Sequence, residues 1–160
     1  MIRKLAIITG LLLCLPSLAA AEIGISQITD FSLPSWSIGD GNINSHIDVC
    51  VFSSSGKSGD YAITVAGSSG YVLTNGSSQI PYALTWDDSG AGSLGQITGT
   101  TLNNNLRLSG QVNGNTKSAT CSGNNSGPNA RLSLKINEAD MAAALAGTYS
   151  GAVTIIVSAN

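Results

Sequence analysis

The sequence ends with the stretch GTYSGAVTIIVSAN, residues 147–160, in which a glycine–tyrosine turn leads into an alternating, β-branched run. Alternation with a period of two is typical of a β-strand, and it places Val153, Ile155 and Val157 on one side of that strand. A strand of this kind must pair along both edges or remain exposed as an edge that attracts other chains. This ending therefore indicates assembly with a partner rather than chemistry.

The same alternation recurs through the rest of the chain, and helical periodicity is nearly absent. Clear strands are predicted over 47–52, 61–66, 80–86, 131–136 and 153–158, and weaker ones over 25–31, 71–74, 95–98 and 106–109. One short helix is predicted over 138–145, with Asn137 as its N-cap and Gly147 as its end. Short strands separated by glycine, asparagine and aspartate turns predict an all-β protein, a β-sandwich with at most one short helix.

The beginning of the sequence has the pattern of a secretory signal. Two basic residues precede a mainly apolar run over 5–15, and alanines at 19–21 supply a cleavage site. We expect a cleaved signal peptide over 1–21 and a single mature domain over 22–160, so the protein is expected to be exported. An uncleaved membrane anchor is the alternative.

The composition argues against several function classes. The chain has seven basic and nine acidic residues, for a net charge of −2, and charged residues make up only 10% of it. No basic patch is evident in the sequence, so we expect no nucleic acid as a partner. A low charge with many small polar residues is more typical of extracellular β-structure than of a cytosolic enzyme.

Two cysteines, Cys50 and Cys121, remain after the expected cleavage. In an oxidising compartment they are expected to form one disulfide, which the chain-entropy model values at about 4 kcal/mol. Two separate buried thiols are the alternative. No metal or other cofactor is expected, because His46 is the sole histidine and there is no Cys-x-x-Cys pair.

Two tryptophans are the candidate ligand platform. Trp36 lies near the start of the mature domain, and Trp86 precedes Asp87, so an aromatic face stands beside a carboxylate in a way that suits a glycan. The alternative is that both tryptophans fill the core and that Asp87 begins an ordinary turn. His46 and Asp48 share a strand face, but no Gly-x-Ser-x-Gly elbow accompanies them, so we expect no catalytic residue and no enzyme.

Five short motifs follow one another along the chain: FSLPSW at 31–36, IDVCV at 47–51, DYAITV at 60–65, IPYAL at 80–84 and AGTYSGAVTI at 146–155. Their order resembles that of the spore coat protein U-like subunits of archaic bacterial chaperone–usher pili. The resemblance covers most of the mature chain. It also includes Gly147, because subunits of this kind often have a glycine at that distance from the end.

The resemblance implies an immunoglobulin-like, pilin-type sandwich that lacks its final strand. In such subunits a periplasmic chaperone fills the resulting groove, and at the outer-membrane usher a strand of another pilus subunit replaces it. Carried over to this chain, Val153, Ile155 and Val157 would line the groove and face the chaperone. The protein would pass through the periplasm to the cell surface, without a catalytic step.

The sequence departs from this family near its start. Only residues 22–30 precede the first motif, Ile23, Ile25 and Ile28 do not keep one alternating face, and the first-strand cysteine of the family is missing. Three explanations stay open: an abbreviated donor strand, a subunit that accepts a strand without donating one, and a fold that completes itself. A self-complete secreted adhesin, or a module that binds a host or surface glycan, is the alternative function.

Overall fold

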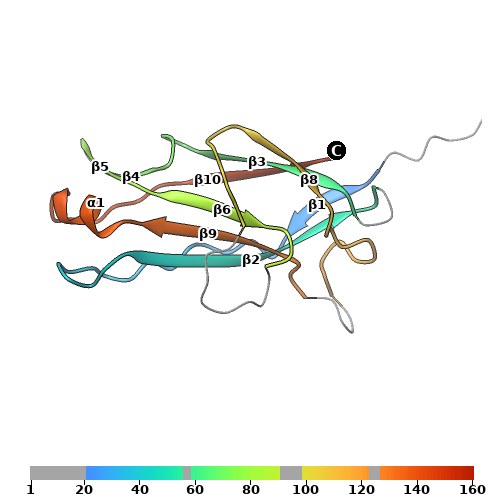
Figure 1. The fold of residues 1–160 in the computed structure, drawn as a ribbon, viewed down its shortest axis with the longest axis horizontal. Helices are drawn as coiled ribbons and strands as arrows, with labels where there is room; N and C mark the ends of the chain where they lie inside the picture. Colours follow the sequence, from blue (N-terminus) through green and yellow to red (C-terminus); the bar gives the residue numbers. More distant parts are fainter. Residues whose placement is uncertain (1–20, 56–58, 91–98, 123–126) are drawn as a thin grey trace, which may run out of the picture.

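The computed structural model describes residues 21–55, 59–90, 99–122 and 127–160, which form two packed layers of antiparallel strands with one short helix at one end (Figure 1). The predicted all-β sandwich is therefore confirmed. Residues 1–20 of the expected signal peptide and the strand predicted over 95–98 lie outside the described residues.

The larger sheet has the strand order β1-β2-β9-β6-β7. Its members are β1 (Ile23–Ser26), β2 (Ile43–Ser53), β9 (Ala130–Ile136), β6 (Ala83–Asp87) and β7 (Thr100–Thr101). The long strand β2 is shared between two neighbours, because its first half pairs with β9 and its second half with β1. The strand predicted near the start begins earlier than expected and ends at Ser26, since Gln27 has a φ of 60° and turns the chain out of the sheet.

The smaller sheet has the order β10-β3-β8, formed by β10 (Val153–Ser158), β3 (Tyr61–Gly67) and β8 (Arg107–Gln111). A separate hairpin joins β4 (Val72–Asn75) to β5 (Ser78–Pro81). The strand predicted over 80–86 is divided between β5 and β6, because the backbone N–H of Tyr82 donates to Tyr71 O at 2.9 Å as the chain passes from the hairpin to the larger sheet.

The core lies between the two sheets and is filled by the inward side chains of the central strands. Its largest member is Trp86, which is 1% exposed and meets Tyr61 edge-on, with ring centroids 6.5 Å apart. The indole N–H of Trp86 donates to the Tyr61 hydroxyl at 3.2 Å. Full burial of side chains of this size contributes about 2–3 kcal/mol each, so this pair helps to hold β3 of one sheet against β6 of the other.

The helix α1 (Glu138–Ala143) follows β9 and buries Met141. It ends earlier than predicted, at Ala143 rather than before Gly147, because Ala144 is already extended. Asn137 occupies the N-cap position, but its side chain makes no capping bond. The side chain of Asn42 supplies that bond instead, since its Oδ1 accepts the Glu138 N–H at 2.9 Å.

The predicted disulfide joins Cys50 of β2 to Cys121, with an S–S distance of 2.02 Å. Both cysteines are buried, and they tie the loop that precedes β9 to the second half of β2. The alternative of two separate thiols is therefore wrong.

Candidate functional site: an open side of the sandwich

The side of the sandwich that carries β7 and β8 is bridged by the chain itself. Between these strands the backbone crosses from one sheet to the other and bonds to both. The N–H of Leu102 donates to Leu84 O at 2.9 Å, and the N–H of Asn105 donates to Val65 O at 3.0 Å. This side is thereby closed by main-chain hydrogen bonds to β6 and β3.

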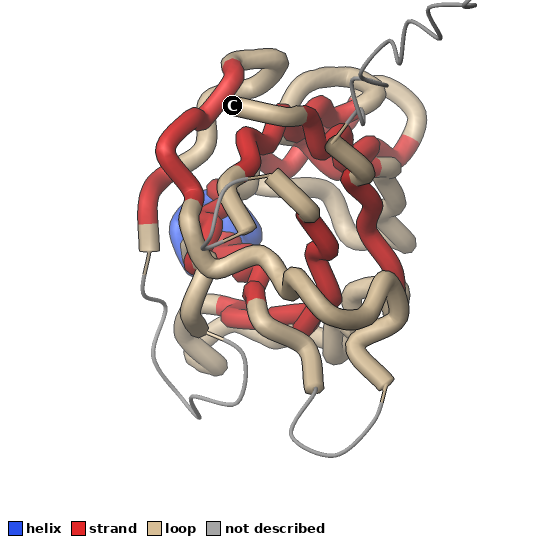
Figure 2. Tube along the Cα trace, turned by 90° about the vertical axis from the view of Figure 1, so that its right-hand side faces the viewer, coloured by secondary structure: helices blue, strands red, loops and turns tan. Residues whose placement is uncertain are grey.

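The opposite side carries β1 and β10, and its construction is different. β1 pairs with β2 alone and β10 with β3 alone, so within the described residues no strand is paired to the second edge of either. Some Cα atoms of β1 and β10 lie within 8 Å of each other, and β1 lies at the end of the molecule at which β10 and the chain finish (Figure 1). We call this the open side. Figure 2 views the sandwich from that end, with the helix behind the strands.

On β10, side chains alternate between the interior and the solvent. Val153, Ile155 and Val157 pack against the core but are only partly buried, whereas Thr154 and Ile156 are exposed. The sequence pattern predicted this division of faces. Because the three inward side chains are half-buried, they present apolar surface along the open side. Their predicted role as the surface that faces a chaperone stays a prediction.

The other wall of the open side has two parts. β1 is the first part, and the chain then leaves the sheet at Gln27 and returns beside the start of β2. There, Phe31, Leu33 and Trp36 pack against the core, and the hydroxyl of Ser45 donates to Ser32 O at 3.2 Å. The apolar motif at 31–36 therefore forms the second part of this wall, although it is not a regular β-strand.

A cavity of about 730 Å³ opens between this wall segment and the chain that joins α1 to β10. We call it the apolar groove. Two large apolar side chains of its lining are strongly exposed, Ile38 at 83% and Leu145 at 71%, and they come from the two opposite walls. Its floor consists of buried core residues, namely Ile43, Leu73, Ile80, Ile136 and Met141. The groove therefore reaches the core from outside, and its size is that of pockets that hold apolar groups.

The wall that leads into β10 is held in place by hydrogen bonds. The hydroxyl of Tyr149 lies 2.6 Å from the Ser78 hydroxyl and donates to Leu145 O at 2.8 Å. Thr74 and Ser150 exchange two backbone hydrogen bonds, of 2.8 and 3.1 Å. A Cβ at Gly147 would overlap the side-chain amide of Asn75, so the glycine lets this amide lie against the wall where it passes the hairpin.

The candidate ligand platform is not a single site. Trp36 lines the apolar groove, and its indole N–H donates to Gly41 O at 2.8 Å. Trp86 is enclosed in the core, so the interpretation of Trp86 as a surface platform is wrong and the core alternative is right. Asp87 shapes the turn after β6, where its Oδ1 accepts bonds from the N–H and the hydroxyl of Ser89 at 3.0 and 3.2 Å.

The buried polar residues make contacts that hold strands together. Asp48 and Arg131 face each other across β2 and β9, and Arg131 donates to the two carboxylate oxygens at 2.6 and 3.0 Å. The hydrogen bond that Arg131 donates to Asp48 raises the pKa of Arg131, which stays charged in the sheet. His46 is exposed, and the described residues contain no group of three or more potential metal ligands. No helix in the described part of the chain is both long and apolar enough to cross a membrane.

Sequence reasoning did not find the apolar groove. Its walls come from segments about a hundred residues apart, 33–38 and 144–149, and the helix between β9 and β10 determines how they meet. The available signal was the apolar spacing of Phe31, Leu33 and Trp36 in a stretch that is otherwise polar.

Comparisons by sequence give no match, either to family models or to curated proteins. Among solved structures, the chain is similar to a chain of the structure described as "Chaperone-tip adhesin complex is vital for synergistic activation of CFA/I fimbriae biogenesis". The identity is 17% and the TM-score is 0.46, over 86% of this chain and 42% of the other. This chain therefore spans less than half the length of that neighbour.

Proposed function

We propose that this protein is a structural subunit of a surface pilus, completed by a strand that a neighbouring protein inserts along its open side. The observation that carries the proposal is the asymmetry of the two sides. The side that carries β7 and β8 is bridged by the protein's own backbone. On the open side, the second edge of β10 has no paired strand in the described residues.

The chemistry of the open side suits an extended strand. The second edge of β10 offers backbone N–H and C=O groups, and an added strand gains main-chain hydrogen bonds there. Alternate apolar side chains of that strand would cover Val153, Ile155 and Val157 and then reach the apolar groove beside Trp36. Each buried side chain of the size of valine or leucine contributes about 1.5–3 kcal/mol, so a few of them stabilise the complex substantially.

The partners follow from this exchange of strands. A periplasmic chaperone supplies the strand in transit, and at an outer-membrane usher another pilus subunit supplies it in the fibre. The protein is exported and ends at the cell surface. The free energy of folding and strand addition drives assembly of the fibre, so the function needs no catalytic residue and no cofactor.

The test uses the mature, oxidised chain and a synthetic peptide of alternating valine and threonine. The expected result is a rise in the thermal midpoint with peptide concentration, because a ligand that binds only the folded state stabilises it. The control peptide has the same composition with all valines grouped at one end. Equal effects of the two peptides, or a stable monomer whose β10 amides are all protected from hydrogen exchange without any partner, would contradict the proposal.

The alternative function is glycan binding by a self-complete domain, and the position of Trp36 on the apolar groove favours it as the second candidate. In that case a glycan that the protein binds on a glycan array would raise the thermal midpoint, and the alternating peptide would not. Substitution Trp36→Ala would then abolish glycan binding, while the exchange of the β10 amides would stay unchanged.

A further inference from the structure

We propose that the disulfide-bonded loop over residues 115–121 holds β1 in place, so that Cys50, Cys121, Ser26 and Gln27 act as positioning residues for one wall of the open side. The importance of that wall rests on the proposed function. The positioning itself follows from contacts between the loop, β2 and β1, and it can be measured without any partner strand.

The loop is attached to β2 along the backbone. The N–H of Asn115 donates to Val51 O at 2.7 Å, and the N–H of Ser53 donates to Asn115 O at 3.0 Å. The side-chain oxygen of Asn115 then accepts the N–H groups of Lys117 and Ser118, at 2.8 and 3.0 Å. These bonds fix the start of the loop against the same half of β2 that pairs with β1.

The far end of the loop depends on the disulfide. Cys121 has a φ of 47°, a left-handed conformation that disfavours residues with a side chain by about 1 kcal/mol or more. Its N–H donates to Ser118 O at 3.2 Å, and its sulfur is bonded to Cys50, which is opposite Ser26 in the β1–β2 register. The disulfide therefore holds the tight turn directly over the place where β1 ends.

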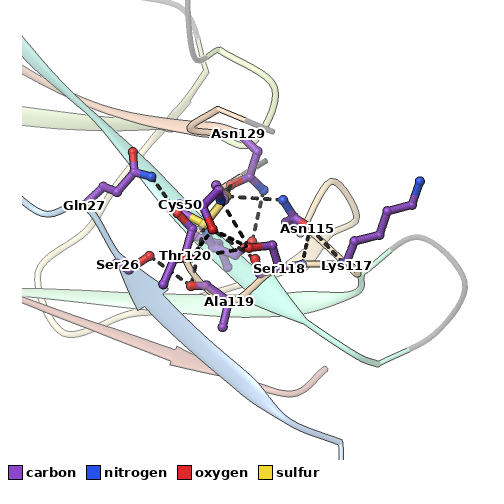
Figure 3. Close-up of a disulfide and its surroundings, with 12 residues drawn as sticks. Ser26, Gln27, Cys50, Asn115, Lys117, Ser118, Ala119, Thr120 and Asn129 are labelled. Carbon is purple, nitrogen blue, oxygen red and sulfur yellow. Dashed lines mark hydrogen bonds between the residues drawn. A yellow bond between two sulfur atoms is a disulfide. The ribbon is translucent and has the colours of Figure 1, made fainter. Parts of the chain in front are cut away.

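Two carbonyl groups of this turn bind the end of β1 (Figure 3). The hydroxyl of Ser26 donates to Ala119 O at 3.0 Å, and the side-chain amide of Gln27 donates to Thr120 O at 2.7 Å. At the other end of β1, the N–H of Glu22 donates to the Ser54 hydroxyl at 2.7 Å. β1 is thus fastened at both ends.

These end contacts matter because β1 is short. It has four residues and pairs with β2 alone, and a strand of this length on a sheet edge opens readily. Without the disulfide, the turn loses the constraint that keeps Cys121 left-handed, and the two carbonyl acceptors no longer stay beside Ser26 and Gln27. We expect β1 to separate from β2 while the centre of the sheet stays intact.

The experiment measures hydrogen exchange in the mature chain and compares the peptide covering residues 22–30 with the one covering β9. The first variant combines Cys50→Ala with Cys121→Ala. The second keeps the disulfide and combines Ser26→Ala with Gln27→Glu, which removes both donors at the end of β1. Both are expected to speed exchange in 22–30 about tenfold, with little change in β9.

The matched control combines Ser77→Ala with Gln79→Glu, the same kinds of change at exposed positions of the β4–β5 hairpin, and it should leave exchange in 22–30 unaltered. If the cysteine variant fails to fold, the Ser26 and Gln27 variant decides alone. Unchanged exchange in 22–30 in that variant would overturn the proposal. Faster exchange without any response to the valine–threonine peptide would instead contradict the proposed function and leave the positioning of β1 supported.

Discussion

Ile155 and Ile156 are consecutive residues of β10, yet they occupy different environments: Ile155 packs against the core from the open side, whereas Ile156 is 54% exposed on the opposite face of the sheet. They pair with Val65 and Thr64 of β3, respectively. This pair of identical side chains on opposite faces offers a direct test of which face of β10 an added strand would cover.

Replacing Ile155 with threonine should lower the free energy of unfolding by about 1–2 kcal/mol, because apolar contacts are lost and a hydroxyl is placed at the edge of the core. Replacing Ile156 with threonine should change it by about 0.5 kcal/mol or less. Denaturant unfolding measures both. Ile155→Thr should also weaken the stabilisation by the valine–threonine peptide, and an equal loss in Ile156→Thr would contradict the assignment of faces.

Tyr61 should make the stability of the fold depend on alkaline pH. Burial raises the pKa of its hydroxyl well above the usual value near 10. The unfolded chain loses this proton as the pH passes about 10, while the folded chain retains it, so the stabilisation present below pH 10 is lost as the pH rises.

Unfolding measured between pH 8 and about 11 should therefore show a steeper loss of stability in the parent chain than in Tyr61→Phe. At neutral pH the variant should itself be less stable by about 1–3 kcal/mol, because the buried indole N–H of Trp86 loses its acceptor. Identical pH slopes in the two proteins would show that Tyr61 does not titrate differently on folding.

Removing one partner of the ion pair between Asp48 and Arg131 should lower the free energy of unfolding. Arg131 has only 3% of its side chain exposed, so Asp48→Asn takes from this buried guanidinium the carboxylate to which it donates at 2.6 and 3.0 Å. The expected loss is about 2–4 kcal/mol in denaturant unfolding, less than for a fully enclosed pair because Asp48 is 28% exposed. The combined replacement of Asp48 by Asn and Arg131 by Met should recover part of that loss, and a purely additive result would count against coupling.

Even the small side chain of alanine at position 147 should lower the stability of the fold. In Gly147→Ala, the new Cβ meets the Asn75 amide, so the Asn75 side chain must leave its place between the hairpin and the wall that leads into β10. We expect a loss of about 0.5–1.5 kcal/mol and a weaker response to the valine–threonine peptide. Gly127→Ala is the control, since a Cβ there meets no atom within 4 Å. Equal stability of the two variants would rule out a tight fit at Gly147.

The amino-acid sequence by itself determined which segments become the main strands. In β9 and β10 the apolar residues alternate with a period of two, and this pattern depends only on neighbouring residues in the chain. The disulfide was also predictable, because two cysteines in an exported chain have few other partners. Local patterning could not divide the strand predicted over 80–86, which breaks where Tyr82 bonds to Tyr71.

The tertiary structure alone decided what is buried and what stays open. Trp36 and Trp86 are the same residue type in similarly polar surroundings, yet one lines the apolar groove and the other fills the core. Similarly, nothing within β10 specifies that its second edge has no paired strand in the described residues, since this depends on where β1 is held and on how residues 102–105 bridge the opposite side. Burial and edge pairing are relations between distant segments, which a local pattern does not encode.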